Sequence, residues 1–308
     1  MTDLPTTAHA LIDADISIIP VKADGTKAPA LPWKPYTQQR ADHDTATAWF
    51  TDTTYGLGII TGSISNNLLM VEIEGDHISL LPELVDTANA SGLSDLWQTV
   101  STGWVEQSPS GGMHWLIRTT NPPQGNQKLA RAEDGTVIAE TRGEGGYVVA
   151  APTSGTVHAT GKPWTRIIGG PTTIPTLDSD NTTALLELFS SLNQHTPTVV
   201  DAPPPTRPHN PDTDGVRPGD DYNARADWSD ILTEWTPVKT FHDGGIGWRR
   251  PGKNDPGISA TTGRNDADNL YVFSSSTEFE QEKAYSKFAA HTLLNHGGDW
   301  AAAARDLG

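Results

Sequence analysis

The stretch Val71-Glu72-Ile73-Glu74-Gly75 decides the expected fold, because it joins an apolar strand to a pair of acids. Residues 67–74 are rich in apolar and β-branched types and end at a glycine, which is typical of a β-strand. Side chains alternate between the two faces of a strand, so Glu72 and Glu74 share one face about 6.6 to 6.8 Å apart. The two carboxylates can share a metal cluster, although a surface strand that simply exposes two glutamates has the same pattern. The opposite face carries Leu69, Val71 and Ile73 into a core.

Composition limits the classes of protein to consider. The 308 residues, 35% of them hydrophobic, can form one large core or two smaller ones, and we expect two domains. Because the chain has no cysteine, disulfides, thiolate catalysis and zinc held by cysteine are excluded, and any metal must bind Asp, Glu or His. A formal net charge of -17 argues against a broadly basic protein that coats nucleic acid. Contacts with polynucleotides are therefore expected only at restricted patches.

A second candidate segment is a small turn that leads into an apolar strand. The turn Ser108-Pro109-Ser110-Gly111-Gly112 is followed by Met113, His114 and Trp115-Leu116-Ile117. Glycines let a backbone approach a phosphate closely, while the Ser110 hydroxyl and the His114 ring can donate hydrogen bonds to its oxygens. The turn is therefore a candidate cradle for a triphosphate. A hairpin turn beside a half-buried histidine is the alternative.

A third segment, Ala139-Glu140-Thr141-Arg142, adds one more acid. Glu140 lies near the end of a predicted strand, with Arg142 beside it and a glycine-rich turn after it. With the earlier pair and the histidine, it completes a set of three acids and one histidine, each on or beside a strand-like segment. An exposed turn with a salt bridge is the alternative for this segment alone.

The chain divides at a segment dense in proline and polar residues, which is typical of a semi-extended linker. We expect a first domain over residues 1–194, a linker over 195–220 and a small module over 221–308. In the first domain, strands are predicted at 16–21, 57–61, 67–74, 113–118, 137–140 and 147–151, and a helix at 182–193. In the module, strands are predicted at 239–242, 247–250, 258–262 and 270–273, and helices at 283–296 and 299–307.

In this order, the segments resemble the bifunctional primase-polymerase (prim-pol) domain of phage and plasmid replication proteins, within the archaeo-eukaryotic primase superfamily. The resemblance covers roughly residues 8 to 170. Five spaced elements match the family pattern in order, although each is weak alone. They are Lys27-Ala28-Pro29 with Trp33, Gly58-Ile59-Ile60-Thr61-Gly62, Glu72-Ile73-Glu74, Ser110 to His114, and Glu140 with Arg142 and Gly145-Gly146-Tyr147.

The resemblance implies an α+β fold whose catalytic core is an RRM-like mixed sheet with flanking helices. It also implies a DNA primase and DNA polymerase, which is a nucleotidyltransferase that copies single-stranded DNA template from nucleoside triphosphates. Two divalent ions, Mg²⁺ or Mn²⁺, would bind Glu72, Glu74 and Glu140.

The same resemblance assigns the remaining residues of the site. His114 joins the three acids as a catalytic residue and, with Ser110, holds the triphosphate. Arg142 and Lys27 are expected as further phosphate contacts. A surface ion pair and a solvated loop lysine are the alternatives for these two.

The acids depart from the family pattern, which usually has aspartates where this chain has three glutamates. A glutamate reaches one methylene farther, so the metals would sit farther from their strands. Altered metal preference and loss of activity are both consistent with that change. A non-catalytic replication protein that binds DNA or nucleotide through a degenerate site therefore stays open, as does a metal-dependent nuclease.

Residues 221–308 are expected to form a β-hairpin and helical module that binds template. Between Lys239 and Arg264, five Lys or Arg stand against two Asp, a local charge of +3. Phosphate contacts and base stacking suit such a patch, and a tryptophan packed inside an ordinary strand is the alternative. A low-grade resemblance to the zinc ribbon of primases, without its cysteines, suggests a metal-free module for primer initiation. The predicted DNA-binding residues are Trp248, Arg249, Arg250 and Lys253.

Two expectations concern the setting of the protein. No export signal and no apolar run near about 18 residues is present, so a cytoplasmic protein is expected, in the host cytoplasm if it is encoded by a phage. Proteins of the resembled family often continue into a helicase, and the chain is expected to be the N-terminal part of such a replication protein. These residues contain no Walker A motif, so ATP-driven unwinding is not expected within them.

Overall fold

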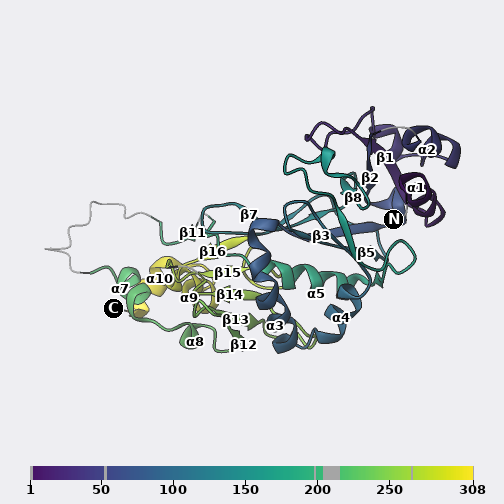
Figure 1. Ribbon diagram of the computed structural model, residues 1–308. Helices are drawn as coiled ribbons and strands as arrows, with labels where there is room; N and C mark the ends of the chain where they lie inside the picture. The colour runs from purple at the N-terminus through teal and green to yellow at the C-terminus, as the bar shows by residue number, and fades with distance from the viewer. Residues whose placement is uncertain (1–2, 52–53, 198, 204–215, 265, 308) are drawn as a thin grey trace. The chain divides into compact units, whose positions relative to one another are not determined.

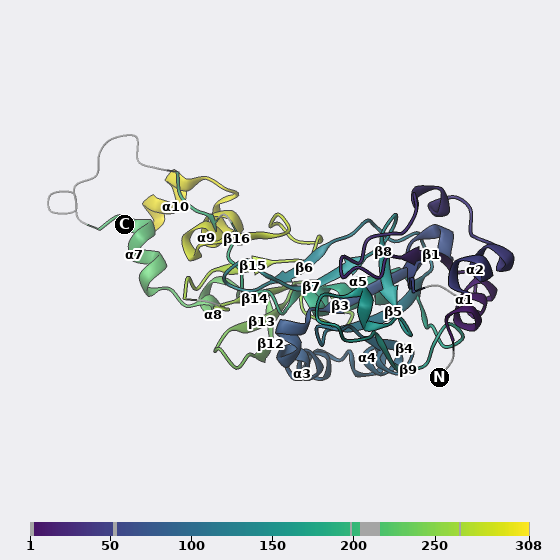
Figure 2. The same cartoon turned by 45° about the horizontal axis from the view of Figure 1, so that its top comes forward.

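The computed structural model describes residues 3–51, 54–197, 199–203, 216–264 and 266–307. These residues form an α+β structure with three sheets, shown in Figure 1 and from a second side in Figure 2. The chain divides into two compact units. The first comprises Met1–Val85, Leu93–Arg131 and Val137–Leu192, and the second comprises Asp86–Gly92, Ala132–Thr136 and Asn193–Gly308.

The smaller sheet of the first unit is built from short apolar strands. Its order is β1 (Ser17–Val21), β2 (Gly56–Ile60) and β8 (Tyr147–Ala150), with antiparallel neighbours. Every residue of β1 and β2 is buried, as expected for strands that lack a polar face. Figure 1 shows α1 (Leu4–Asp13) and α2 (His43–Phe50) beside this sheet.

The central sheet of the first unit has the strand order β6-β7-β3-β5-β4-β9, with antiparallel neighbours. A short parallel pairing of β10 with β5 makes this sheet mixed. Its strands are β3 (Leu68–Ile73), β4 (Trp104–Gln107), β5 (Met113–Thr119), β6 (Lys128–Arg131), β7 (Val137–Arg142), β9 (Thr165–Ile168) and β10 (Thr176–Leu177).

The two faces of the central sheet carry different side chains. On one face, the Trp115 ring lies 5.4 Å from both Trp97 and Phe189, measured between ring centroids. These partners belong to α4 (Ser94–Ser101) and α5 (Ser179–Ser190), so the two helices cover that face. The other face is apolar where it packs with the small sheet, α1 and α2, and it becomes polar farther along the strands. Its apolar residues are Leu68, Met70, Trp104 and Leu116.

Helix starts in the first unit follow capping chemistry. The Asp42 carboxylate accepts a hydrogen bond from Thr45 N–H at the start of α2, and Asp178 does the same for Asn181 at the start of α5. Helix α3 (Leu81–Ser91) follows a 3₁₀ helix at Gly75–Leu80. Further 3₁₀ helices lie at Lys34–Thr37, Ser63–Ser65 and Gly155–Val157.

The second unit is built on a sheet with the order β11-β16-β15-β14-β13-β12. Its core is rich in aromatic rings, and Trp228, Trp235, Trp248 and Phe279 share one buried cluster. The strands are β11 (Val199–Val200), β12 (Thr236–Thr240), β13 (Ile246–Arg249), β14 (Ala260–Thr262), β15 (Leu270–Val272) and β16 (Lys283–Tyr285). The helices are α7 (Pro218–Arg225), α8 (Trp228–Ile231), α9 (Lys287–His296) and α10 (Trp300–Leu307).

The structure corrects three expectations about the C-terminal half. The module is a six-stranded sheet with helices rather than a β-hairpin with helices. The helix predicted over 283–296 is wrong at its start, because Lys283–Tyr285 pairs as β16 and Ser286 caps α9 by accepting from Ala289 N–H. Within the predicted linker 195–220, Val199–Val200 forms β11 and α7 begins at Pro218, while residues 198 and 204–215 lie outside the described residues.

Helix α5 offers a matched test of how the first unit is held together. Leu185 is fully buried, whereas its neighbour Leu186 is only partly buried. We expect Leu185→Ala to lower the free energy of unfolding by about 2 to 5 kcal/mol, because it leaves a cavity. Leu186→Ala removes the same atoms and should cost clearly less. Chemical denaturation followed by circular dichroism measures both, and equal losses would contradict the packing described here.

Candidate active site

A row of charged side chains crosses the polar part of the central sheet. On β3, Glu72 lies directly opposite His114 of β5 and Glu140 of β7. Directly opposed residues share one face of a sheet. The same register adds one residue from each of β6, β4 and β9. In strand order from β6 to β9, this charged row consists of Lys128, Glu140, Glu72, His114, Glu106 and Arg166.

Ion pairs between neighbours hold the middle of the charged row. His114 Nε2 lies 3.1 Å from Glu72 Oε1, and these side chains are only 5% and 10% exposed. Glu140 is fully buried and forms ion pairs with Lys128 through one oxygen and with Arg142 through the other. Removing a carboxylate from water costs several kcal/mol unless a partner compensates it. These partners therefore allow the acids to stay ionised inside the protein.

The charges of the row shift the pKa values of its members. Burial opposes the charged forms of Glu72 and His114, but their mutual attraction outweighs it, so the pKa of Glu72 is lowered and that of His114 is raised. Burial and then the charge of Glu72 raise the pKa of Glu74, against the pull of Lys27. An acid whose pKa is raised by another acid gains from a bound cation.

Glu72, Glu74 and Glu140 form the compact acidic group expected from the sequence. One carboxylate oxygen from each lies within 4.8 Å of the other two. Carboxylate oxygens are the hard ligands that Mg²⁺ and Mn²⁺ prefer. The donor set therefore fits divalent ions of this class.

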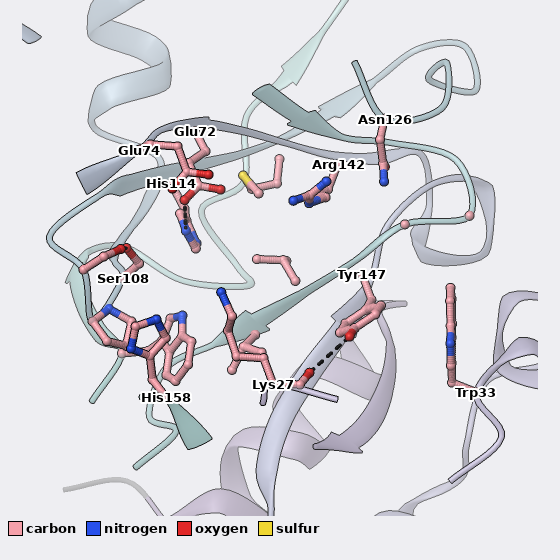
Figure 3. A pocket seen from close by; sticks show the side chains of 18 residues that line it. Lys27, Trp33, Glu72, Glu74, Ser108, His114, Asn126, Arg142, Tyr147 and His158 are labelled. Carbon is pink, nitrogen blue, oxygen red and sulfur yellow. Dashed lines mark hydrogen bonds and ion pairs between the residues drawn. The ribbon is translucent and has the colours of Figure 1, made fainter. Parts of the chain in front are cut away.

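Glu72 and Glu74 line a pocket of about 330 Å³, a size common for small-molecule sites. Figure 3 shows Glu72, Glu74 and His114 at one side of it and Trp33 at the other, with the Lys27 ammonium pointing into the cavity. All five residues line the pocket.

Lys27 has an unusual backbone conformation, with φ at 60° in the left-handed region. The Tyr147 hydroxyl donates a hydrogen bond to its carbonyl at 3.1 Å, drawn as a dashed line in Figure 3. The Tyr147 ring also meets Trp33 edge to face, with centroids 5.2 Å apart. Tyr147, itself packed against Trp33, therefore holds the backbone of Lys27 in place.

The serine turn is fixed against the end of β3. Ser108 N–H donates to the carbonyl of Gly112 at 2.8 Å, and the hydroxyls of Ser108 and Ser110 lie 3.0 Å apart. A side chain on Gly112 would place its Cβ 2.7 Å from the carbonyl oxygen of Ile73, and one on Gly75 would collide with the backbone of Ser110. Glycine at these two positions brings the hydroxyls next to the acids.

Comparison with known families gives one match. The model of the bifunctional DNA primase/polymerase N-terminal domain, Prim-Pol, matches residues 8–177. The chain belongs to the Prim-Pol family. It is thus a nucleotidyltransferase by family, and membership implies DNA primase and polymerase activity on a DNA template with nucleotides. A search of the curated proteins gave no match to the chain.

The match confirms the resemblance drawn from the sequence and places the whole pocket within the Prim-Pol domain. Of the seven residues predicted for catalysis and phosphate binding, six line this pocket, and the seventh, Glu140, lies within the acidic group. Among the described helices, none is long and apolar enough to cross a membrane. The six lining residues are Lys27, Glu72, Glu74, Ser110, His114 and Arg142.

The predicted DNA-binding residues lie in the second unit, outside the Prim-Pol match. Trp248 is only 2% exposed, and its indole N–H donates to Thr262 Oγ1 at 2.9 Å. The expectation that Trp248 stacks on template bases is therefore corrected, because its ring belongs to the core. Arg249 donates to the carbonyl of Gly257 at 3.1 Å, and Arg250 is likewise partly buried, as is Lys253.

Sequence reasoning missed several residues at the site. Lys128 pairs with Glu140 across the β6–β7 hairpin, and Asp134-Gly135 between those strands is a strong hairpin signal that predicts this pairing. Glu106 could also have been found, because an acid inside a short apolar strand indicates a buried charge with a specific role. Asn126 and His158 also line the pocket, but their surroundings in the sequence carry no pattern that points to it.

Glu106 ties the charged row to the chain beyond β8. One of its oxygens accepts from the Trp104 indole N–H at 2.9 Å and lies 3.6 Å from Arg166 Nε. The other accepts from Ala151 N–H at 2.8 Å. Burial raises the pKa of Glu106, and these two hydrogen bonds oppose the rise.

Loss of Glu106 should destabilise the Prim-Pol domain. Glu106→Ala leaves the buried donors of Trp104 and Ala151 without their acceptor, and we expect a loss of about 3 kcal/mol in the free energy of unfolding. Gln107→Ala, at the exposed neighbouring position of β4, is the matched control and should change little. Denaturant titration measures both, and a Glu106→Ala protein as stable as the control would contradict this role.

Proposed function

We propose that this Prim-Pol protein extends or starts a DNA strand at the pocket of the first unit, by transferring a nucleotide from a nucleoside triphosphate. The observation that carries the proposal is a compact group of three carboxylates, two of which line the pocket together with the cations of Lys27 and Arg142. Nucleotidyl transfer needs this combination, because metal-binding acids and the triphosphate are both negatively charged.

Glu72, Glu74 and Glu140 would hold Mg²⁺ or Mn²⁺, and these ions would assist loss of a proton from the 3′-hydroxyl and offset negative charge on the pyrophosphate. His114 keeps Glu72 ionised and oriented through its 3.1 Å contact. Lys128 and Arg142 do the same for Glu140. Glu72 and Glu140 thus have partners that fix their longer side chains.

Opposite walls of the pocket suit opposite ends of a nucleotide. Lys27, Arg142 and the hydroxyl of Ser110 offer charge and hydrogen bonds to phosphate oxygens. Trp33 and Tyr147 offer aromatic surface, and aromatic rings stack well on nucleic acid bases. A nucleoside triphosphate has the size and polarity that this arrangement can bind.

We infer a template-binding role for Arg249, Arg250 and Lys253 of the second unit, through phosphate contacts and without stacking on Trp248. The local charge of +3 between Lys239 and Arg264 supports this role in a chain whose net charge is -17. A part in primer initiation, and a place at the front of a phage or plasmid replication protein with a helicase, are extensions of the same proposal.

The assigned acids can be tested in a primer-synthesis and primer-extension assay. Single-stranded template, dNTPs or NTPs, and Mg²⁺ or Mn²⁺ are incubated with wild type, Glu72→Ala or Glu74→Ala. We expect each substitution to lower product formation by about 100-fold or more, because a metal-binding carboxylate is lost. Glu133→Gln, at an exposed acid outside the pocket, should retain activity.

The outcome of this assay distinguishes a polymerase from a non-catalytic binding protein and from a nuclease. Product formed at the wild-type rate by both variants would refute the assigned site. No product from correctly folded wild type would favour a protein that only binds DNA or nucleotide, and degradation of the template would identify a nuclease. Circular dichroism spectra of the variants show whether a loss of product reflects a loss of fold.

Template binding by the second unit has a separate test. Lys253→Gln should weaken binding of single-stranded DNA and reduce the slope of log affinity against log salt by about 0.7, the value for one phosphate contact on a single strand. Arg225→Gln, at an exposed arginine of α7 in the same unit, is the control. Fluorescence anisotropy at several salt concentrations measures both, and equal slopes for the two variants would remove Lys253 from the interface.

A further inference from the structure

Two histidines and an aspartate meet between the last two helices of the second unit. His291 and His296 belong to α9, and Asp306 belongs to α10. One candidate ligand atom from each lies within 4.8 Å of the other two. The imidazole centroids are 5.2 Å apart, and His296 Nε2 is 3.7 Å from Asp306 Oδ2. This cluster is separate in sequence and in donor type from the three glutamates of the pocket.

Both histidines bury a nitrogen that lacks a hydrogen bond. Among the residues that the structure describes, Nε2 of His291 and Nε2 of His296 are buried and have no hydrogen-bond partner. A buried polar atom without a partner costs about 1 to 3 kcal/mol, and most buried polar atoms of native proteins have a partner. The cluster therefore has the composition and the unmet bonding capacity of a ligand site.

The other nitrogen of His291 is already held in place. Its Nδ1 lies 3.2 Å from the Tyr222 hydroxyl and 3.0 Å from the side-chain amide of Asn295. A phenol oxygen can accept a hydrogen bond, and so can an asparagine amide in its other orientation. When Nδ1–H donates to either group, the Nε2 lone pair is free to bind a metal. Metal-binding histidines are commonly oriented in this way.

Asp306 supplies the negative charge. Its side chain is 67% exposed, so it can move toward the two nitrogens without disturbing the core. Ligand atoms of a tetrahedral site lie about 3.3 Å apart when the bonds are about 2.0 Å, so the cluster needs only a modest contraction.

We propose that His291, His296 and Asp306 bind a divalent transition metal ion, with Zn²⁺ as the preferred ion. Two imidazoles and one carboxylate form a donor set that suits Zn²⁺, whereas Mg²⁺ and Mn²⁺ prefer oxygen ligands alone. Three protein ligands leave the fourth position open to water. The bound ion links α9 to α10 and, through the Tyr222 contact with His291, orders α7 beside them.

The proposal is tested on the full chain by metal binding, in a readout independent of polymerase activity. Excess Mg²⁺ is kept present so that the oxygen ligands of the pocket are occupied. Zn²⁺ content after dialysis and the visible absorption of added Co²⁺ are compared for wild type, His296→Asn and Asp306→Asn. His242→Asn, at an exposed histidine of the same unit, is the matched control.

We expect one equivalent of Zn²⁺ in wild type and in the control, with loss of that equivalent in His296→Asn. Asp306→Asn should bind at least about 10-fold more weakly, and Tyr222→Phe should also weaken binding by about 10-fold because it removes a partner of Nδ1. Zn²⁺ should raise the melting temperature of wild type but not of His296→Asn. Since Asp306 is exposed, Asp306→Asn gives a result even if the histidine variant folds poorly.

Two results would overturn the site. The first is a wild-type chain that binds no Zn²⁺ under these conditions, which would mean that water satisfies the two nitrogens. The second is an equal zinc content in wild type, His296→Asn and Asp306→Asn, which would place the ion elsewhere.

Discussion

The contact between Glu72 and His114 is the constraint on which the active-site half of the molecule depends. Neither group could stay charged at this depth alone, because burial opposes the ionised form of both. Their pairing is possible only in the observed register of β3 and β5. A shift of β3 by one residue would turn Glu72 away from His114 to the helix-covered face, where Trp115 now packs. One register thus sets the acids, the histidine and the aromatic core together.

The sequence predicts individual strands of this site better than their partners. β3, β5 and β8 were expected within a residue or two, since apolar alternation and flanking glycines mark such strands. The same alternation correctly assigns Glu72 to one face and Val71 to the other. It does not reveal which distant strand lies alongside, so the ion pair of Glu106 with Arg166 emerges only from the sheet order, whereas the Asp134-Gly135 turn could have indicated the pairing of Lys128 with Glu140.

In the second unit, the sequence pattern misassigned one residue and did not reveal a cluster of three others. The sequence of Trp248 followed by two arginines predicts an aromatic and basic patch, but the indole lies in the core and both arginines are partly buried. His291, His296 and Asp306 escaped notice because their spacing has no simple helical period. Only the packing of α9 against α10 makes them neighbours.

The left-handed backbone at Lys27 has a consequence for how this protein can change. A residue other than glycine pays about 1 kcal/mol or more for that conformation, so glycine would make position 27 easier to fold. It would also remove the ammonium that faces the acids. At position 27, a residue that favours folding stability therefore differs from the residue that supplies positive charge to the pocket. Selection of variants for heat resistance alone would tend to replace this lysine. The gain in thermal stability would be accompanied by weaker binding of anions in the pocket.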